Sequence, residues 1–330
     1  MVLITQFVDN PHGYGRICRN DAGQVVAIVE QKDANEAQQQ IKEVNTGILA
    51  VDNRHLHDWL PKLSNDNAQG EYYLTDLVAM AVENGFEVNT MQAHHDYEVQ
   101  GVNSKTQLVE LERVYQTNRA LQLLEQGVHV IDPARIDVRG ELTVGAETFM
   151  DVNCVFEGTN VIGKGVHIEP NCLIKNSVIG DGVVIKANTL IEDSTIENDC
   201  ELGPFARIRP QTHLKERVKV GNFVETKKST VGVGSKVNHL SYIGDADIGE
   251  NSNIGAGTIT CNYDGVNKHK TIIGNEVRIG SNSSLVAPVV IHDRATTGAG
   301  TVVRSNVERE QLAVSGGKQK NISGWKRPEK

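Results

Sequence analysis

Histidine is the side chain best suited to take a proton from an amine near neutral pH, and the chain has eleven histidines. Most of them must be ordinary surface residues. His239 differs because two aliphatic residues expected to point inward, Val237 and Ile243, flank it, so His239 would lie on an outward-facing side. Metal binding by three histidines is the alternative use, and it requires closely spaced partners. The candidates for that use are isolated in the sequence: His213, His239, His269 and His292.

Charged residues and cysteines narrow the class of protein. The chain has 33 Lys+Arg against 42 Asp+Glu, a formal net charge of −9, which argues against nucleic acid or an anionic membrane as the main partner. No apolar stretch is long enough to span a membrane, and residues 1–10 lack the pattern of a secretory signal. The five cysteines are odd in number and never form C-x-x-C. They fit neither a disulfide framework nor a zinc site, so we expect a cytoplasmic protein.

The elements that position these residues follow from a six-residue repeat of aliphatic residues. Glycine is abundant (31 residues) and aromatic residues make up only 5% of the chain, as expected for a core built from small aliphatic units. A period of six fits neither a helix nor a plain strand, but it fits a coil with three short sides and small residues at its corners. The sequence predicts eight or nine stacked coils of 17 or 18 residues. The repeating positions are Ile162, Ile168, Ile174, Ile179, Ile185, Ile191, Ile196, Leu202, Ile208, Leu214, Val220, Val231, Val237, Ile243, Ile248, Ile254, Ile273, Ile279, Leu285 and Ile291.

The repeat is interrupted once, by the polar stretch Thr260–Thr271. This stretch carries Lys268 and Lys270. Loops inserted into repeat folds lie on one face and often carry function.

Residues 1–127 have a different composition, with 9 basic and 18 acidic residues, whereas residues 128–330 have 24 of each. Patterning in the first segment predicts buried strands at Val25–Val29 and Gly47–Val51, a helix from Tyr73 to Val82, and a long helix from about Ser104 to Gln126. No glycine-rich phosphate loop is present in the sequence. The segment therefore looks like the back half of an α/β nucleotide-binding domain.

Several long motifs identify a family. The chain closely resembles, over essentially all 330 residues, the bacterial bifunctional enzymes that are both glucosamine-1-phosphate N-acetyltransferases and N-acetylglucosamine-1-phosphate uridylyltransferases. These enzymes make UDP-N-acetylglucosamine for peptidoglycan and lipopolysaccharide precursors. The matching motifs are Gly13–Arg16, Val29–Asp33, Glu43–Gly47, Asn67–Asp76, Gly203–Pro210, Val220–Glu225, Asn238–Tyr242 and Asn253–Gly265.

The resemblance implies a fold and a division into domains. We expect a left-handed parallel β-helix of hexapeptide repeats at residues 128–330, assembled as a homotrimer with acetyl-CoA sites between chains. A linker helix would occupy residues 104–127, and residues 1–103 would be the remnant of a Rossmann-like uridylyltransferase domain.

The resemblance also implies roles in acetyl transfer. His239 matches the catalytic base, and the matches to glucosamine-1-phosphate contacts are Arg209, Lys227, Tyr242, Asn253 and Lys268. The matches to acetyl-CoA contacts are Ala256, Asn262, Tyr263, Ser281, Ala299 and Gly316. The amide of Asn262 could also stabilise the oxyanion that develops on the thioester. The family has an arginine where this chain has Gly316, so coenzyme affinity would depend on a substitute such as Lys318 or Lys320.

The uridylyltransferase site is expected to be incomplete. Gly15, Glu30, Asn45 and Asn103 match contacts to UDP-N-acetylglucosamine, and Asn103 also matches a Mg²⁺ ligand. The family's phosphate loop and its metal-binding aspartate have no counterpart in the printed sequence, so we expect the reaction with UTP to be lost. Two alternatives to an acetyltransferase remain open: a non-catalytic trimeric scaffold, and a zinc lyase of the kind some β-helix proteins form.

Overall fold

The computed structural model describes residues 1–317 and Ser323, and these residues form two compact units, Met1–Val114 and a second unit that begins at Tyr115. Each unit has its own hydrophobic core. Within the described residues, no helix is long and apolar enough to cross a membrane.

The first unit is built on a five-stranded sheet in the order β3-β2-β4-β1-β5. Strand β5 runs parallel to β1, and the other neighbouring strands are antiparallel. The predicted strand Val25–Val29 is confirmed as β3, and the other two predictions lie within one to four residues of β4 and α3. The elements are β1 (Val2–Phe7), β2 (Arg16–Arg19), β3 (Val25–Val29), α1 (Glu36–Gln39), β4 (Glu43–Ala50), α2 (Asn53–Trp59), α3 (Asp76–Glu83), β5 (Asn89–Gln92) and the 3₁₀ turns Leu60–Lys62 and Asp96–Glu98.

Helix α4 (Lys105–Glu125) confirms the predicted long helix, and its second half closes the first coil of the β-helix. Ala120 and Leu123 are buried in the same core as the first coil. The buried side chain of Gln116 donates a hydrogen bond to the carbonyl of Val138 (3.1 Å) and accepts one from its N–H (2.7 Å). A stack of identical coils leaves an apolar end that must be covered, and this half of α4 covers it.

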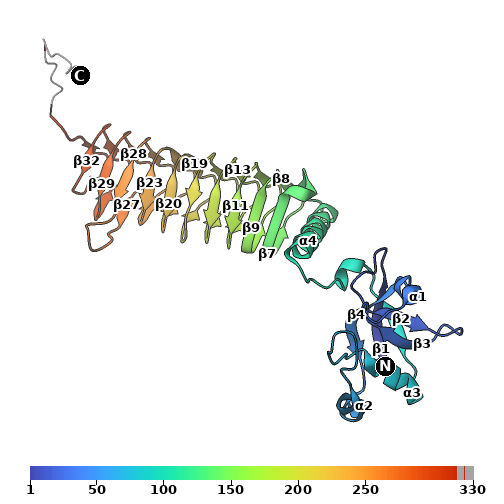
Figure 1. Ribbon diagram of the computed structural model, residues 1–330. Helices are drawn as coiled ribbons and strands as arrows, with labels where there is room; N and C mark the ends of the chain where they lie inside the picture. Colours follow the sequence, from blue (N-terminus) through green and yellow to red (C-terminus); the bar gives the residue numbers. More distant parts are fainter. Residues whose placement is uncertain (318–322, 324–330) are drawn as a thin grey trace. The chain divides into compact units, whose positions relative to one another are not determined.

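The second unit is a parallel β-helix with three flat faces, which confirms the fold class (Figure 1). The first face holds eleven strands: β6 (His129–Val130), β8 (Phe149–Met150), β10 (His167–Ile168), β13 (Val184–Ile185), β16 (Glu201–Leu202), β19 (Lys219–Asn222), β22 (Lys236–His239), β25 (Asn253–Ile254), β28 (Arg278–Ile279), β31 (Thr296–Thr297) and β33 (Leu312–Ala313).

The other two faces begin with the long strands β7 (Ile136–Val144) and β9 (Cys154–Ile162), which each span both faces. A 3₁₀ turn at Pro133–Arg135 precedes β7. The second face continues with β11 (Leu173–Lys175), β14 (Leu190–Glu192), β17 (Arg207–Ile208), β20 (Glu225–Lys227), β23 (Tyr242–Gly244), β26 (Ile259–Cys261), β29 (Ser284–Val286) and β32 (Val302–Val303). The third continues with β12 (Val178–Ile179), β15 (Thr195–Ile196), β18 (His213–Leu214), β21 (Thr230–Val231), β24 (Ala246–Ile248), β27 (Thr271–Ile273) and β30 (Val289–Ile291).

The predicted six-residue positions form the interior of this prism. All of them are at most 3% exposed, and they line up along the axis, as Val220, Val237, Ile254 and Ile279 do. Burying one such side chain contributes about 1.5–3 kcal/mol, so the stacked columns dominate the stability of the unit.

The predicted number of coils was too small. The eleven strands of the first face begin at His129, well before the first residue of the predicted repeat. In these early coils the interior is filled by residues of mixed size, such as Met150 and Phe156, so the aliphatic period is not visible in the sequence. The predicted interruption is confirmed: a loop over residues 262–270 separates β26 from β27.

Candidate active site

Three basic side chains lie together at the edge between the second and third faces. Arg209 follows β17, Lys227 ends β20, and Lys268 belongs to the loop 262–270. Lys268 lowers the pKa of Lys227 more than any other group, and Arg209 adds to this effect while Asp245 opposes it. Neighbouring ammonium groups repel each other, and a bound anion would relieve the repulsion.

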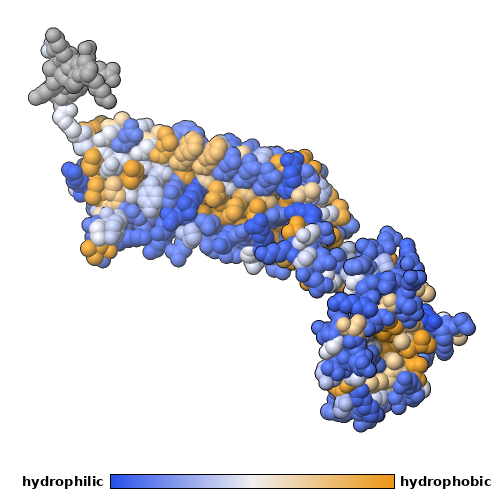
Figure 2. All heavy atoms as spheres, in the orientation of Figure 1, coloured by the Kyte–Doolittle hydropathy of each residue, from blue (hydrophilic) through white to orange (hydrophobic). Residues whose placement is uncertain are grey.

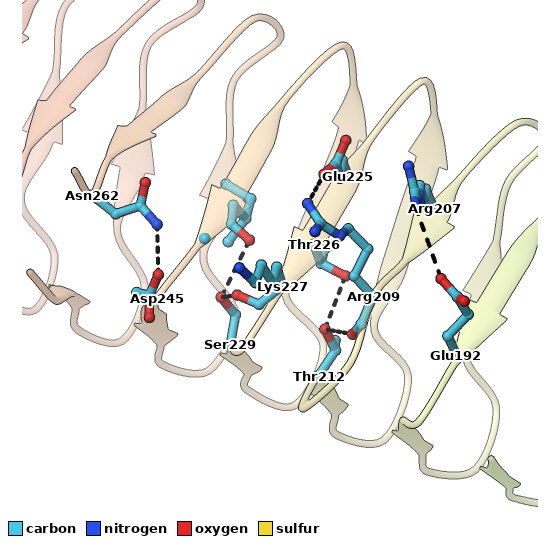
Figure 3. A network of polar contacts seen from close by, with 12 residues as sticks. Glu192, Arg207, Arg209, Thr212, Glu225, Thr226, Lys227, Ser229, Asp245 and Asn262 are labelled. Carbon is cyan, nitrogen blue, oxygen red and sulfur yellow. Dashed lines mark hydrogen bonds and ion pairs between the residues drawn. The ribbon is translucent and has the colours of Figure 1, made fainter. Parts of the chain in front are cut away.

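Two carboxylates border this cluster, which we call the basic cluster (Arg209, Lys227 and Lys268). Arg209 Nη1 lies 2.6 Å from Glu225 Oε1, and the Asp245 carboxylate lies 3.6 Å from Lys228 Nζ. Figure 3 shows Arg209, Lys227 and Asp245 along one edge of successive coils. The neighbouring carboxylates orient the cations without neutralising all of them.

Tyr242, in β23, points toward the same edge. Its hydroxyl lies over Gly244, the residue that pairs with Lys227 in the neighbouring coil. A Cβ added at Gly244 would come within 2.4 Å of Tyr242 Oη, so only glycine leaves this space for the phenol. The structure therefore brings Tyr242 to the side of the basic cluster.

His239 ends β22, at the edge between the first and second faces, and its side chain is exposed. Its Nδ1 lies 3.0 Å from Asn222 Oδ1, on the preceding coil. An amide oxygen can only accept, so Nδ1 carries the hydrogen and Nε2 keeps the lone pair needed by a base. Sequence reasoning missed Asn222, although its separation of 17 residues from His239 is one coil length and would have indicated the contact.

A groove of about 370 Å³ lies beside His239 and is lined by residues of the first face and its edge, including Lys186, Glu201, Lys219 and Asn222. The two lysines lower the pKa of Glu201 to about 2. Because these charges already pair with one another, the groove offers less free positive charge than the basic cluster does.

Three predicted acetyl-CoA positions form one column with His239. The N–H of Gly257 bonds to the carbonyl of His239 (3.1 Å), that of Asn282 to Ala256 (2.7 Å) and that of Gly300 to Ser281 (2.8 Å). Along this edge the order is therefore His239, Ala256, Ser281 and Ala299, one residue per coil. The small side chains beyond His239 leave room at the surface, and we call this strip the small-residue column (Ala256, Ser281 and Ala299).

The other predicted site residues, Asn253 and Gly316, lie outside the basic cluster and the small-residue column. Asn253 lies on the first face, paired with Lys236 and Arg278 on the adjacent coils. Gly316 follows β33 with a φ of +112°. The suggested substitutes Lys318 and Lys320 lie outside the described residues.

Asn262 and Tyr263, both predicted to contact acetyl-CoA, have opposite environments. Tyr263 is exposed, with its hydroxyl donating to the carbonyl of Gly265 at 2.5 Å. Asn262 is only 7% exposed, and its Nδ2 donates to Asp245 Oδ2 at 2.6 Å (Figure 3). This contact engages one amide hydrogen of Asn262 and ties the loop to the coil, which disfavours the suggested oxyanion role.

In the first unit, three of the four predicted nucleotide-site residues lie together. A Cβ on Gly15 would come within 3.2 Å of the Glu30 carboxylate, and the carbonyl of Gly15 accepts a hydrogen bond from the N–H of Asn45 (2.8 Å). Asn103 lies just before α4, and its N–H bonds to Gln107 Oε1 (2.8 Å). In the described part of the chain no three His, Cys, Asp or Glu side chains gather as metal ligands.

All five cysteines are free: Cys18, Cys154, Cys172, Cys200 and Cys261. Burial inside the coils raises the pKa of the Cys154 thiol to about 12 and those of Cys172 and Cys200 to about 11. These three thiols remain protonated at neutral pH and are poor nucleophiles, which argues against covalent catalysis by them.

Comparison with known proteins places this geometry in a family. Residues 138–220 match the family model described as GMPPB C-terminal domain, and residues 270–305 match bacterial transferase hexapeptide (six repeats), which confirms the transferase class. A solved Francisella novicida UDP-N-acetylglucosamine acyltransferase is 18% identical to this chain, and the match covers 57% of this chain and 66% of that one with a TM-score of 0.28.

Two bacterial relatives match almost the whole chain. The bifunctional protein GlmU of Marinobacter nauticus is 58% identical over 330 residues, 100% of this chain and 73% of that protein. The GlmU of Pseudomonas putida is 56% identical over 328 residues, 99% of this chain and 72% of that protein. At this identity and coverage, the chain belongs to the family of bifunctional GlmU proteins.

Proposed function

We propose that this chain transfers the acetyl group of acetyl-CoA to the amine of glucosamine-1-phosphate. The product, N-acetylglucosamine-1-phosphate, would serve UDP-N-acetylglucosamine synthesis. The observation that carries the proposal is the basic cluster, in which Lys227 and Lys268 stand side by side on the same chain as a histidine with a free Nε2. Membership in the GlmU family supports it.

His239 would act as the general base. The amine nitrogen attacks the thioester carbonyl while Nε2 of His239 takes a proton from that nitrogen. The tetrahedral intermediate then collapses, the bond from carbon to sulfur breaks, and the coenzyme thiolate takes the proton back from the imidazolium. The amide of Asn222 would hold the ring in the required tautomer.

The basic cluster would bind the phosphate of the sugar substrate. A guanidinium binds phosphate through paired donors and an ammonium acts as a point charge, so Arg209 with Lys227 and Lys268 offers both modes. The hydroxyl of Tyr242 and the amide of Asn253 would bind sugar hydroxyls.

Acetyl-CoA would lie along the small-residue column, which follows His239 and runs toward the C-terminal end of the coils. This direction brings the thioester to His239 and leaves the nucleotide end near Gly316, with Tyr263 contacting the coenzyme. Asn262 would contribute by anchoring the loop.

A homotrimer is part of the proposal. Phe205, Phe223 and Leu240 occupy one corner position, on the coil of His239 and the two coils before it, and all three are about half exposed or more. Figure 2 shows hydrophobic surface exposed along the β-helix. Burial of this ridge between chains would remove apolar area from water and deepen the coenzyme site. A cytoplasmic location, where free cysteines persist, fits the same proposal.

One assay tests the proposal against a non-catalytic scaffold. We expect release of free coenzyme A from acetyl-CoA only when glucosamine-1-phosphate is present. Glucosamine without the phosphate should react far more slowly, because it cannot use the basic cluster. Equal rates with the two sugars would refute the assigned phosphate site, and no release with either would favour the scaffold.

Loss of uridylyl transfer stays a prediction of this proposal. The test is incubation of the printed chain with UTP, Mg²⁺ and N-acetylglucosamine-1-phosphate, followed by chromatography for UDP-N-acetylglucosamine. We expect no product, because Asn103 alone cannot organise an octahedral ion with a triphosphate. Product formation at an ordinary enzymatic rate would contradict it.

A further inference from the structure

Asp245 lies at the base of the loop 262–270 and contacts both of its ends, and Figure 3 shows the contact with Asn262. Its carboxylate accepts a hydrogen bond from Asn262 Nδ2 (2.6 Å), and its main-chain carbonyl accepts one from the N–H of Thr271 (3.1 Å). Its own N–H bonds to the carbonyl of Lys227 (3.0 Å). One residue thus connects the two ends of the loop to the strand that carries Lys227.

The hydrogen bond between Asp245 and Asn262 is strengthened by its shielding from water. The Asp245 side chain is 8% exposed and Asn262 is 7% exposed, so both groups are largely shielded from water. A shielded carboxylate is costly without partners, and here the partners are the Asn262 amide and the ammonium of Lys228 at 3.6 Å. Removal of the carboxylate would leave the Asn262 amide unsatisfied.

The rest of the loop is held together by its own contacts. The Asp264 carboxylate accepts hydrogen bonds from the N–H groups of Val266 (2.8 Å) and Asn267 (2.7 Å), and it lies 2.7 Å from His269 Nε2. Tyr263 and Lys268 pair across the loop as an antiparallel bridge. A loop with this internal structure moves as one piece, so its base determines where Lys268 lies.

Lys227 and Lys268 repel each other, which would push an unanchored loop away from the coil. We propose that Asp245 is a positioning residue: through Asn262 it holds the loop 262–270 against the coil and keeps Lys268 beside Lys227. The catalytic value of this contact rests on the proposed function, whereas the anchoring of the loop does not.

Kinetics test the proposal with three variants. Asp245→Ala should raise KM for glucosamine-1-phosphate about tenfold or more, the effect of losing a buried charged hydrogen bond, and leave KM for acetyl-CoA nearly unchanged. Asp245→Asn keeps an oxygen that can accept from Asn262, so its KM values should stay close to those of the unmodified chain. Asp247→Ala is the matched control, because Asp247 pairs with Lys270 of the same loop but its side chain is about half exposed, and it should change little.

Limited trypsin digestion gives a readout that is independent of activity. We expect faster cleavage after Lys268 in Asp245→Ala, and unchanged cleavage in Asp245→Asn and Asp247→Ala, with thermal unfolding used to show that all three remain folded. If Asp245→Ala shows unchanged KM and unchanged cleavage, or if Asp245→Asn behaves like Asp245→Ala, the proposal is wrong. Faster cleavage of Asp245→Ala in a chain without acetyl transfer would uphold the anchor and refute the proposed function instead.

Discussion

At the scale of single residues, the environment of His239 determines which ring nitrogen can accept a proton. Asn222 occupies Nδ1, so the base must be Nε2. His239→Ala should lower kcat for acetyl transfer by about 10²–10⁴-fold, the usual contribution of a general base, without unfolding the β-helix. His213→Ala is the matched control, because His213 lies in the same β-helix with its Nε2 2.8 Å from Glu197 Oε1. Near-full activity of His239→Ala at neutral pH would show that another group is the base.

The basic cluster predicts a pH dependence of phosphate binding. The pKa of Lys227 is lowered, first by Lys268, so its ammonium loses its proton at a lower pH than an isolated lysine does. Affinity for N-acetylglucosamine-1-phosphate, which has no titrating amine, should therefore fall as pH rises through this lowered pKa. In Lys268→Ala the fall should move to higher pH while affinity at neutral pH decreases. Calorimetric titration at increasing pH measures both effects, and an unshifted profile would mean that the two lysines do not interact.

The sequence indicated the types of these residues but not their contacts. His239, Lys227 and Lys268 were identifiable from their motifs, because the motifs are continuous in the chain. Asn222 and Asp245 act across 17 residues, one coil away from His239 and Asn262. Such a partner can be predicted only by examining the residue one coil length before or after each candidate site residue.

At the scale of elements, strand β23 leaves room for the Tyr242 side chain because it ends in a glycine. Gly244 ends β23, and the space above it is filled by the Tyr242 hydroxyl. Gly244→Ala should displace the phenol, because the new Cβ would come within 2.4 Å of Oη. We expect a raised KM for glucosamine-1-phosphate with little change in KM for acetyl-CoA. Tyr242→Phe is the companion variant: if both variants leave KM unchanged, Tyr242 does not contact the sugar phosphate.

Elements with one dominant pattern were predictable from the sequence, and elements with mixed patterns were not. The repeat from Ile162 onward specifies one small aliphatic residue per side, and the strands follow it. The coils before Ile162 contain the nine-residue strands β7 and β9, which span two faces and contain Gly140 and Gly158 within them. A strand that turns a corner without a break has no fixed six-residue spacing, so these coils escaped the pattern.

At the scale of the whole molecule, assembly should control activity. The exposed ridge of Phe205, Phe223 and Leu240 lies on the coil of His239 and the two coils before it, and the rings of Phe205 and Phe223 stack with their centroids 5.3 Å apart. A charge introduced in the middle of a buried ridge would be costly, so Phe223→Asp should dissociate the trimer and lower acetyl transfer together. Val178→Asp, a similarly exposed position on the third face, should do neither. Sedimentation velocity under assay conditions measures the state of assembly.

Mixing of inactive chains tests whether one site draws on two chains. A His239→Ala chain lacks the base and should be nearly inactive, and an Asn262→Ala chain lacks the loop anchor and should be impaired when glucosamine-1-phosphate is kept well below its KM. If the loop of one chain reaches the His239 of its neighbour, each site uses the histidine of one chain and the loop of the next. In a mixed trimer, a site is then intact where the Asn262→Ala chain supplies His239 and the His239→Ala chain supplies the loop. Denaturation and refolding of the mixture should then restore part of the activity. A fully active monomer of the unmodified chain, or no recovery in mixtures shown to be mixed trimers, would place the whole site on one chain.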